Sequence, residues 1–262
     1  MKDFPLSEPI PRPPVAPLIS VVLPTYNERG NIERLIPALR QCLPWPAEYI
    51  VVDDDSPDGT AAAVAAMRAT HPEIRLIRRR GERGLVSAIQ RGIDESRGRI
   101  VVWMDCDFSL PPATVPELVR PVLEAGMDAA IGSRYVEGGG DETGLARGPL
   151  VLLQKLATGL LNRFTRLVMG APFHDWTSGF IAIRSEVIRT IPLRGDYGEY
   201  FILLMAVLLR DGRRWVEVPY RNVPRQRGSS KTADSFFGLL RRGGRYLFHV
   251  YLAWRLKSGR GA

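Results

Sequence analysis

The sequence is poor in the residues from which disulfide frameworks and many metal sites are built. Among 262 residues there are two cysteines and three histidines. Cys42 and Cys106 lie far apart in different predicted elements, and His71, His174 and His249 share no metal-binding spacing. This pattern argues against a disulfide framework or a Cys/His metal site. It favours a reducing, cytosol-facing location.

Long apolar runs and glycine-rich nucleotide motifs are missing as well. No stretch reaches about 18 uninterrupted apolar residues, so we expect no transmembrane helix. The chain has no Gly-x-Gly-x-x-Gly and no Walker A pattern, which argues against a dinucleotide site or a P-loop. It carries instead a formal charge of +8. That charge predicts an acidic partner: a nucleic acid, an anionic membrane surface or a phosphorylated substrate.

Strands and helices alternate four times in the first half of the chain. A proline-rich arm at 1–17 is expected to be flexible. After it, apolar runs predict strands at 19–24, 49–53, 74–78 and 100–104, each followed by a helical pattern, at 31–41, 59–71, 84–96 and 113–126. This order predicts an α/β fold with right-handed βαβ units and a mostly parallel sheet with helices on both faces.

The rest of the chain follows a less regular pattern. A helix is predicted at about 150–169, and further elements are expected at 179–183, 200–210 and 215–219. We expect one domain at 18–233, in which 18–135 binds a nucleotide and 136–233 binds an acceptor. The basic tail at 234–262 predicts two short helical pieces, interrupted near Gly243 and Gly244.

The strand at 100–104 runs directly into two carboxylates, Asp105 and Asp107. Open α/β sheets bind ligands at the carboxyl ends of their strands. Mg²⁺ is usually held by one or two carboxylates together with substrate phosphates. The pair therefore predicts a divalent metal held against a diphosphate. The structural alternative is that Asp105 ends the strand and Asp107 caps the next helix.

The loops after the first two strands add side chains at the same edge of the sheet. The first loop, 24–28, is Pro-Thr-Tyr-Asn-Glu, and the second, 53–60, is Asp-Asp-Asp-Ser-Pro-Asp-Gly-Thr. Tyr26 can stack on a base, and Glu28 or Asp54 can accept hydrogen bonds from a base or a ribose. Other residues of the second loop are expected to cap the following helix.

Seven motifs resemble, in order, the family 2 inverting glycosyltransferases, and most closely their dolichol-phosphate mannosyltransferase group. They lie at 24–28, 51–60, 84–89, 104–107, 132–135, 178–180 and 227–231, and the likeness spans about 18–235. The resemblance implies a GT-A fold and a nucleotide-sugar donor, with GDP-mannose foremost. It also implies a divalent cation, Mg²⁺ or Mn²⁺, and a polyprenyl-phosphate acceptor.

The resemblance, with the cations of the second half, assigns four sets of residues. The donor set is Pro24, Tyr26, Glu28, Val52, Asp54, Asp105, Cys106, Asp107 and Arg225, although the Cys106 side chain is expected to be a buried filler. The metal set is Asp105, Asp107 and Ser109. Contacts to the acceptor phosphate are assigned to Arg134, Arg147, Arg225, Arg227 and Lys231. Asp105, Asp107, Arg134 and Asp175 form the catalytic set, in which Asp175 orients a sugar hydroxyl or an arginine.

Three positions depart from the mannosyltransferase pattern. Cys106 stands where that group usually has Ala, Ser109 where it has Gln, and Phe201 where a Lys is expected. A serine hydroxyl is a weaker metal ligand than an amide carbonyl, and the missing lysine removes a cation from the phosphate region. These differences concern the identity of the donor and leave the fold unchanged.

The expected chemistry follows from charge. Cleaving the bond between the anomeric carbon and the diphosphate builds negative charge, which a metal and arginines stabilise. Attack from the opposite face inverts the anomeric centre. A hydroxyl acceptor needs a general base, whereas a phosphate monoester is already an anion near neutral pH. A lipid-phosphate acceptor therefore predicts positioning cations and no catalytic base.

The tail at 234–262 mixes aromatic and aliphatic side chains with arginines, which is typical of helices in a membrane interface. We expect peripheral attachment at the cytosolic face of a membrane, and the alternative is a helix packed on the domain.

Three other functions fit parts of the sequence pattern: a UDP-sugar-dependent transferase with another acceptor, a nucleotidyltransferase and a nucleic-acid-binding protein. The first loop lacks the basic, glycine-rich sequence of nucleotidyltransferases. The sequence contains no nucleic-acid-binding motif.

Overall fold

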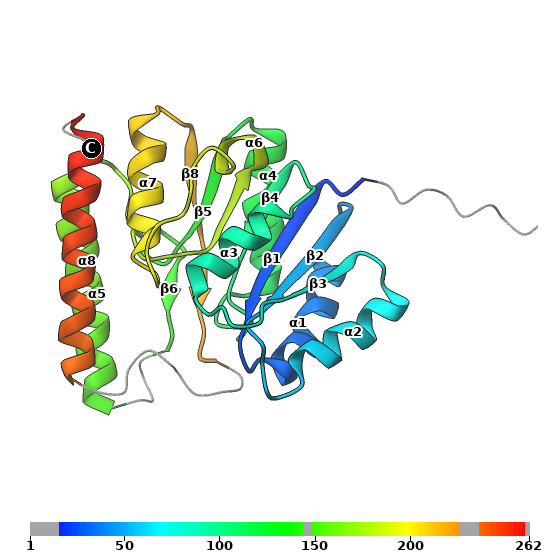
Figure 1. The fold of residues 1–262 in the computed structure, drawn as a ribbon. Helices are drawn as coiled ribbons and strands as arrows, with labels where there is room; N and C mark the ends of the chain where they lie inside the picture. Colours follow the sequence, from blue (N-terminus) through cyan, green and yellow to red (C-terminus); the bar gives the residue numbers. More distant parts are fainter. Residues whose placement is uncertain (1–15, 144–147, 226–235, 260–262) are drawn as a thin grey trace, which may run out of the picture.

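A seven-stranded sheet forms the centre of the protein (Figure 1). The computed structural model describes residues 16–143, 148–225 and 236–259. The strands of the sheet are β1 (Ile19–Thr25), β2 (Ala47–Asp53), β3 (Ile74–Arg78), β4 (Ile100–Trp103), β5 (Ala129–Ser133), β7 (Ile181–Arg184) and β8 (Trp215–Pro219). Their order is β3-β2-β1-β4-β7-β5-β8. β7 runs antiparallel to both neighbours and all other pairs are parallel, which confirms the predicted mostly parallel α/β sheet.

Helices cover both faces of the sheet, over two separate clusters of buried side chains. The first face carries α1 (Arg29–Cys42), α2 (Thr60–Thr70), the short turn η1 (Pro112–Thr114) and α4 (Val115–Glu124). The second face carries α3 (Leu85–Asp94), α6 (Ser185–Ile188) and α7 (Tyr200–Arg210). Along β1, Val21 and Leu23 join the first cluster and Val22 joins the second. Burial on both faces explains why these strands are apolar throughout.

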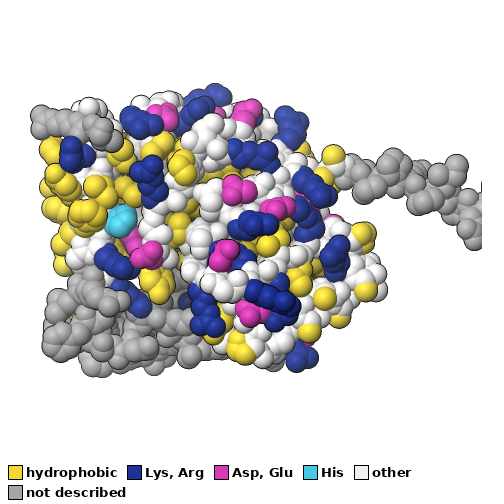
Figure 2. All heavy atoms as spheres, in the orientation of Figure 1, with side chains coloured by type: hydrophobic (Ala, Val, Ile, Leu, Met, Phe, Trp, Pro, Cys, Tyr) yellow, Lys and Arg dark blue, Asp and Glu magenta, His cyan; other side chains and the backbone are white. Residues whose placement is uncertain are grey.

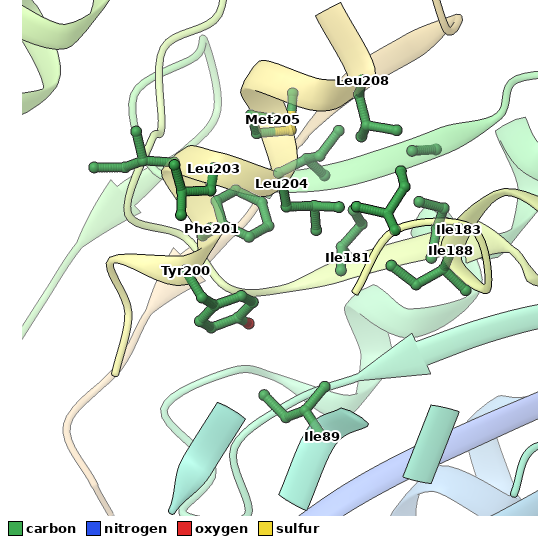
Figure 3. Close-up of a cluster of buried hydrophobic side chains, with 14 of the residues drawn as sticks. Ile89, Ile181, Ile183, Ile188, Tyr200, Phe201, Leu203, Leu204, Met205 and Leu208 are labelled. Atoms are coloured by element: carbon green, nitrogen blue, oxygen red, sulfur yellow. The ribbon is translucent and has the colours of Figure 1, made fainter. Parts of the chain in front are cut away.

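The helix α7 is almost wholly apolar because it is enclosed by the second cluster. Leu204, Met205 and Leu208 pack near Ile181 and Ile183 of β7 (Figure 3). Phe201 is fully buried in the same cluster, with its ring 6.4 Å from that of Phe173. The residue that stands in place of the expected lysine is therefore part of the core.

Two long helices, α5 (Gly148–Met169) and α8 (Phe236–Lys257), lie side by side at the edge of the molecule beyond α7 (Figure 1). They run in the same direction, and Lys257 Nζ donates to the carbonyl oxygen of Met169. The predicted interruption of the tail near Gly243 and Gly244 is wrong, because α8 continues through both. Each glycine costs a helix about 1 kcal/mol relative to alanine, and packing of α8 against α5 and α7 offsets that cost.

A short parallel ladder joins β6 (Gly140–Asp141) to β9 (Arg221–Asn222). It ties the segment after β5 to the segment after β8, so both leave the sheet at the same edge. The strands β5, β7 and β8 come from beyond residue 128 and complete the sheet begun by β1–β4. The expected nucleotide and acceptor parts therefore share one sheet.

Candidate active site

The predicted loops meet at the point in the sheet where the strand order reverses: β2 and β3 are added on one side of β1, and β4 on the other. β1 pairs in parallel with β2 on one side and with β4 on the other. Such a switch point opens a crevice at the carboxyl ends of the strands, and open α/β sheets bind ligands there. β1 ends at Thr25, β2 ends at Asp53, and β4 leads to Asp105.

Asp107 is a buried carboxylate held by two hydrogen bonds and an ion pair. Its Oδ1 accepts from the Ser109 backbone N–H at 2.9 Å and from Ser109 Oγ at 2.6 Å. Its Oδ2 forms an ion pair with Arg225 Nε at 2.7 Å. Ser109, assigned from sequence to the metal, here orients Asp107. Arg225 lies beside the carboxylate where the sequence places the donor diphosphate.

Asp105 lacks such support and is exposed to a cavity. No ion pair or hydrogen bond within the described part of the chain reaches its carboxylate. Desolvation in this recess raises the pKa of Asp105 to about 6, and the charges of Asp107 and Glu28 also raise it while Arg225 lowers it. Two carboxylates with too little positive charge around them are suited to a divalent cation.

The set of available ligands fits a metal that is completed by substrate. Within the described ranges, no group of three or more His, Cys, Asp or Glu side chains converges to hold a metal ion. Mg²⁺ is commonly bound by two carboxylates, phosphate oxygens and water. Asp105 and Asp107 would therefore hold the cation, and a diphosphate would supply further oxygens.

The first two loops are bonded to each other. The Asn27 N–H donates to Ser56 Oγ at 2.9 Å, and the Glu28 N–H donates to Thr60 Oγ1 at 3.1 Å. Gly59 is the N-cap of α2, and Asp58 before it accepts from the N–H of Thr60, the first residue of the helix, at 3.0 Å. These bonds fix the backbone of the crevice independently of any ligand.

Asp54 is engaged by protein groups on both of its oxygens. Oδ1 accepts from Arg79 Nε at 2.7 Å, and Oδ2 accepts from the Gly84 N–H at 2.9 Å. The Arg79 side chain is 4% exposed and that of Asp54 is 10% exposed. The structure thus gives Asp54 a role in holding the 79–84 segment, in addition to the donor contact assigned from sequence.

The sequence did not identify Arg79 and Arg83, because three arginines in a row at 78–80 suggest a solvated surface. Strand register contains the missing signal: Arg78 pairs with Asp53 across β2 and β3, so the next residues on the two strands are neighbours. Arg83 lies over the Tyr26 ring at 4.5 Å. One face of the tyrosine predicted to stack on a base is therefore covered by a cation.

The other donor-set residues differ in what they can offer a ligand. Pro24 lines the cavity, and Glu28 Oε2 accepts from Asn31 Nδ2 at 2.7 Å. The Val52 side chain is fully buried in the core, and its carbonyl oxygen accepts a hydrogen bond from Thr25 Oγ1 at 3.3 Å. Cys106 is 3% exposed and joins the first-face cluster, as expected for a filler.

Arg134 and Asp175 form a buried two-pronged ion pair. Arg134 Nε and Nη2 donate to the Asp175 carboxylate at 2.8 and 2.7 Å, and the Arg134 backbone N–H donates to it at 3.0 Å. Burial alone lowers the pKa of Arg134, but the charge and hydrogen bonds of Asp175 raise it well above its usual value. Of the two roles expected for Asp175, the structure shows the orientation of an arginine.

A cavity of about 850 Å³ extends from Asp105 to α5, α7 and α8. Its polar lining includes Asp105, Arg134, Thr177, Ser178 and Glu199, and its apolar lining includes Leu153, Leu160, Leu161, Phe164 and Leu247. Leu153, Leu160, Phe164 and Leu247 are also exposed, at 42%, 69%, 47% and 52%. The cavity therefore opens onto the surface between α5 and α8, a feature that the sequence did not predict.

Three residues of the predicted acceptor-phosphate set, Arg147, Arg227 and Lys231, lie outside the described residues. Arg225 and Arg134 are described, and they flank the carboxylates Asp107 and Asp175. The arginines that can be located are therefore already paired with acids.

The chain belongs to glycosyl transferase family 2, because the model of that family, "Glycosyl transferase family 2", matches residues 20–191. This confirms the family resemblance of the motifs. It is at odds with the nucleotidyltransferase and nucleic-acid-binding alternatives.

Similar proteins carry names of enzymes of polyprenyl-phosphate mannose chemistry. The chain is 36% identical to the dolichol-phosphate mannosyltransferase of Pyrococcus furiosus, over 89% of this chain and 62% of that protein. It is 34% identical to the polyprenol monophosphomannose synthase of Mycolicibacterium smegmatis, over 82% of this chain and 81% of that protein. The chain thus spans less than two thirds of the length of the Pyrococcus relative.

Solved structures define the fold. Glucosyl-3-phosphoglycerate synthase from Mycobacterium tuberculosis, crystallised with Mn²⁺, UDP-glucose and phosphoglyceric acid, superposes with a TM-score of 0.67 at 23% identity, covering 91% of this chain and 80% of that one. The fold is therefore GT-A-like, as the resemblance implied.

Proposed function

We propose that the protein is a metal-dependent inverting glycosyltransferase that moves a hexose, mannose foremost, from a nucleotide sugar to a polyprenyl phosphate. The observation that carries the proposal is the cavity that joins Asp105 and Arg134 to an apolar mouth between α5 and α8. An isoprenoid chain needs an apolar wall, and its phosphate needs cations. The relatives named as dolichol- and polyprenol-phosphate mannosyltransferases support the same acceptor.

The donor would lie along the crevice between β1 and β4. Tyr26 and Glu28 would contact its nucleoside, and Asp105 and Asp107 would face its diphosphate. A divalent cation, once bound by these carboxylates, would neutralise charge on the leaving diphosphate. At 23% identity the Mn²⁺-containing structures establish only the fold, so the proposed metal rests on this carboxylate pair.

Acceptor activation needs no carboxylate base in this scheme. Asp175, a fully buried acid of the site, is bound by Arg134 through three donors, so its carboxylate orients that arginine. A phosphate monoester is an anion near neutral pH and can attack directly. Arg134 and Arg225 would hold it and the diphosphate in line.

Peripheral attachment to a membrane is part of the proposal. Exposed apolar side chains form a stripe along α5, at Leu152, Leu156, Leu160 and Leu167, with exposures of 57–80%. Leu247, Phe248 and Tyr251 extend this surface onto α8, where hydrophobic side chains gather at the left edge of Figure 2. Among the described helices, none is long and apolar enough to span a bilayer. The surface would lie in the headgroup region, beside a lipid-borne acceptor.

A donor panel tests this function. The full chain would be incubated with GDP-mannose, UDP-glucose or UDP-galactose, with Mn²⁺ or Mg²⁺, and with a short polyprenyl phosphate. We expect transfer from GDP-mannose that is abolished by EDTA and by Asp107→Ala. Transfer that persists in EDTA, or in Asp107→Ala, would contradict the assignment of a metal to Asp105 and Asp107.

The second candidate is a UDP-sugar-dependent transferase with another acceptor. Ser109 favours it, because its hydroxyl bonds Asp107 where the mannosyltransferase pattern has a glutamine. The same panel separates the two functions: a water-soluble phosphorylated acceptor used with a UDP-sugar, and no product on the lipid, would favour the second.

A further inference from the structure

The helix α8 contributes a tyrosine to the cavity that contains Asp105 and Arg134. Tyr246 lines this cavity from its α8 side, and Gly198, Glu199 and Tyr200 line it from the start of α7. A Cβ atom built on Gly198 would lie 2.5 Å from the Tyr246 hydroxyl oxygen. Only a glycine at 198 therefore lets the hydroxyl reach this position.

The Tyr246 hydroxyl is a donor without a partner inside the described part of the protein. Tyrosine hydroxyls in apolar surroundings usually find one, because leaving a polar group unsatisfied is unfavourable. Burial, and then the nearby charge of Glu199, raises the pKa of Tyr246 to about 12. The hydroxyl keeps its proton at neutral pH and is available to donate it.

The surroundings of this hydroxyl favour an anionic oxygen as its partner. Arg134 and Arg242 line the same cavity, and both lie close enough to lower the pKa of Tyr246 by their charge. Glu199, the nearby acid, is 2% exposed and accepts from the Asp196 backbone N–H at 3.2 Å. A hydroxyl that shares a cavity with two guanidinium groups is suited to bind a phosphate oxygen.

We infer that Tyr246 binds the acceptor phosphate: its hydroxyl donates a hydrogen bond to a phosphate oxygen of the lipid while Arg134 supplies charge. α8 then completes the acceptor site and does not serve as a membrane anchor alone. The inference rests on the proposed function, because it requires a phosphorylated acceptor in this cavity.

Tyr246→Phe tests the hydroxyl, because it keeps the ring that packs in the wall. A hydrogen bond to a charged group is worth about tenfold or more in affinity. We expect the KM for a short polyprenyl phosphate to rise about tenfold, with the KM for the donor and the acceptor-independent hydrolysis of the donor unchanged. Tyr49→Phe, at a buried position of β2 in the cluster on the first face of the sheet, is the matched control and should change none of these values.

Gly198→Ala supplies a second, independent variant. Its Cβ would push the hydroxyl away, so it should raise the KM for the acceptor as Tyr246→Phe does. In the Tyr246→Phe background the nearest remaining ring atom is Cζ at 3.7 Å, an ordinary contact, so Gly198→Ala should then cost nothing further.

Two results would overturn the inference. An acceptor KM within twofold of wild type in Tyr246→Phe is one, and a Gly198→Ala effect that persists without the hydroxyl is the other. In both cases wild-type transfer to the lipid would still stand. Absence of any wild-type transfer to the lipid would instead remove the proposed function and this inference together.

Discussion

At the scale of single residues, the two aspartates after β4 differ although one residue separates them. Asp107 is 2% exposed and is bonded to Ser109 and Arg225. Asp105 faces the cavity with a pKa raised to about 6. The supported carboxylate can fix the geometry of a metal site, and the unsupported one gains most from a cation. This difference between the two carboxylates depends on their bonding partners, Ser109 and Arg225, and could not be predicted from the Asp-x-Asp motif.

The raised pKa of Asp105 predicts a pH-dependent stability in the metal-free protein. Its folded pKa lies above the unfolded value near 3.9, so the folded state holds this proton more tightly. The carboxylate therefore lowers stability increasingly as pH rises from about 4 through 6. In EDTA, Asp105→Asn should raise Tm at pH 8 and change it little at pH 4, as measured by differential scanning fluorimetry.

Asp211 provides a control of opposite sign for that measurement. Its hydrogen bond from Arg210 lowers its pKa, so its charge adds stability above the unfolded pKa. Asp211→Asn should leave Tm equal or slightly lower at pH 8. A Tm gain in Asp105→Asn that is the same at pH 4 and pH 8 would contradict the account.

The buried pair of Arg79 and Asp54 predicts a large loss of stability on truncation. Arg79→Met leaves the Asp54 carboxylate buried without its charge partner, which costs about 3–5 kcal/mol. Arg78→Met is the matched control, because its pair with Asp55 has both side chains more than 40% exposed and is worth less than about 1 kcal/mol. Urea unfolding measures both, and equal losses would show that Arg79 is not the buried partner.

Local spacing within one strand or loop was enough to single out Asp105, Asp107 and Asp58. The structure shows their bonding partners, and the roles of Asp105 and Asp107 toward a metal stay predictions. Arg79 was missed because its partner Asp54 lies on a neighbouring strand. Phe201 was interpreted against a family pattern as a lost cation, and the structure places its ring in the core.

At the scale of elements, the continuous helix α8 corrects the predicted break. Helix propensity treats each glycine as unfavourable, but it does not include the packing of α8 against α5 and α7. Gly243 is exposed, and an added Cβ there would meet nothing within 4 Å.

Gly243→Ala should therefore stabilise the protein. In a continuous helix, replacing an exposed glycine by alanine gains roughly 0.5–1 kcal/mol. Thermal or urea unfolding measures the gain. Gly212→Ala is the contrasting variant, because Gly212 has φ +62° and alanine is strained there. A loss of stability in Gly243→Ala would indicate that α8 is interrupted after all.

The apolar surface on α5 and α8 predicts membrane binding that depends on side chains. Cutting off the tail is a poor test, because Val250 and Ala253 of α8 are buried in the core. Replacing Leu247, Phe248 and Leu167 by Gln instead keeps the fold. In flotation with anionic phospholipid vesicles, the wild type should float and this variant should remain at the bottom.

The control for flotation lies at the opposite edge of the protein. Ala65→Gln and Ala66→Gln change exposed positions on α2 and should leave flotation unchanged. If the Leu247, Phe248 and Leu167 variant floats like the wild type, the surface between α5 and α8 is not the membrane contact.

At the scale of the whole molecule, the alternation of strands and helices was sufficient to predict the sheet. β1 to β4 are local units whose order follows from βαβ connection rules. The insertion of β7, antiparallel between β4 and β5, depends on contacts between distant segments. The same is true of the cavity, which needs α5, α7 and α8 together. The donor edge was therefore predictable from sequence and the acceptor cavity was not.

The central claim is that this cavity takes a lipid phosphate as the attacking group. In the most direct measurement, the full chain is incubated with labelled GDP-mannose and Mn²⁺. The acceptor is either a polyprenyl phosphate or the polyprenol of the same chain length. Because a phosphate monoester is already an anion and an alcohol must first lose a proton, the account predicts labelled product in the organic phase with the phosphate and none with the alcohol. Label on the polyprenol, or label transferred only to a water-soluble acceptor, would contradict it.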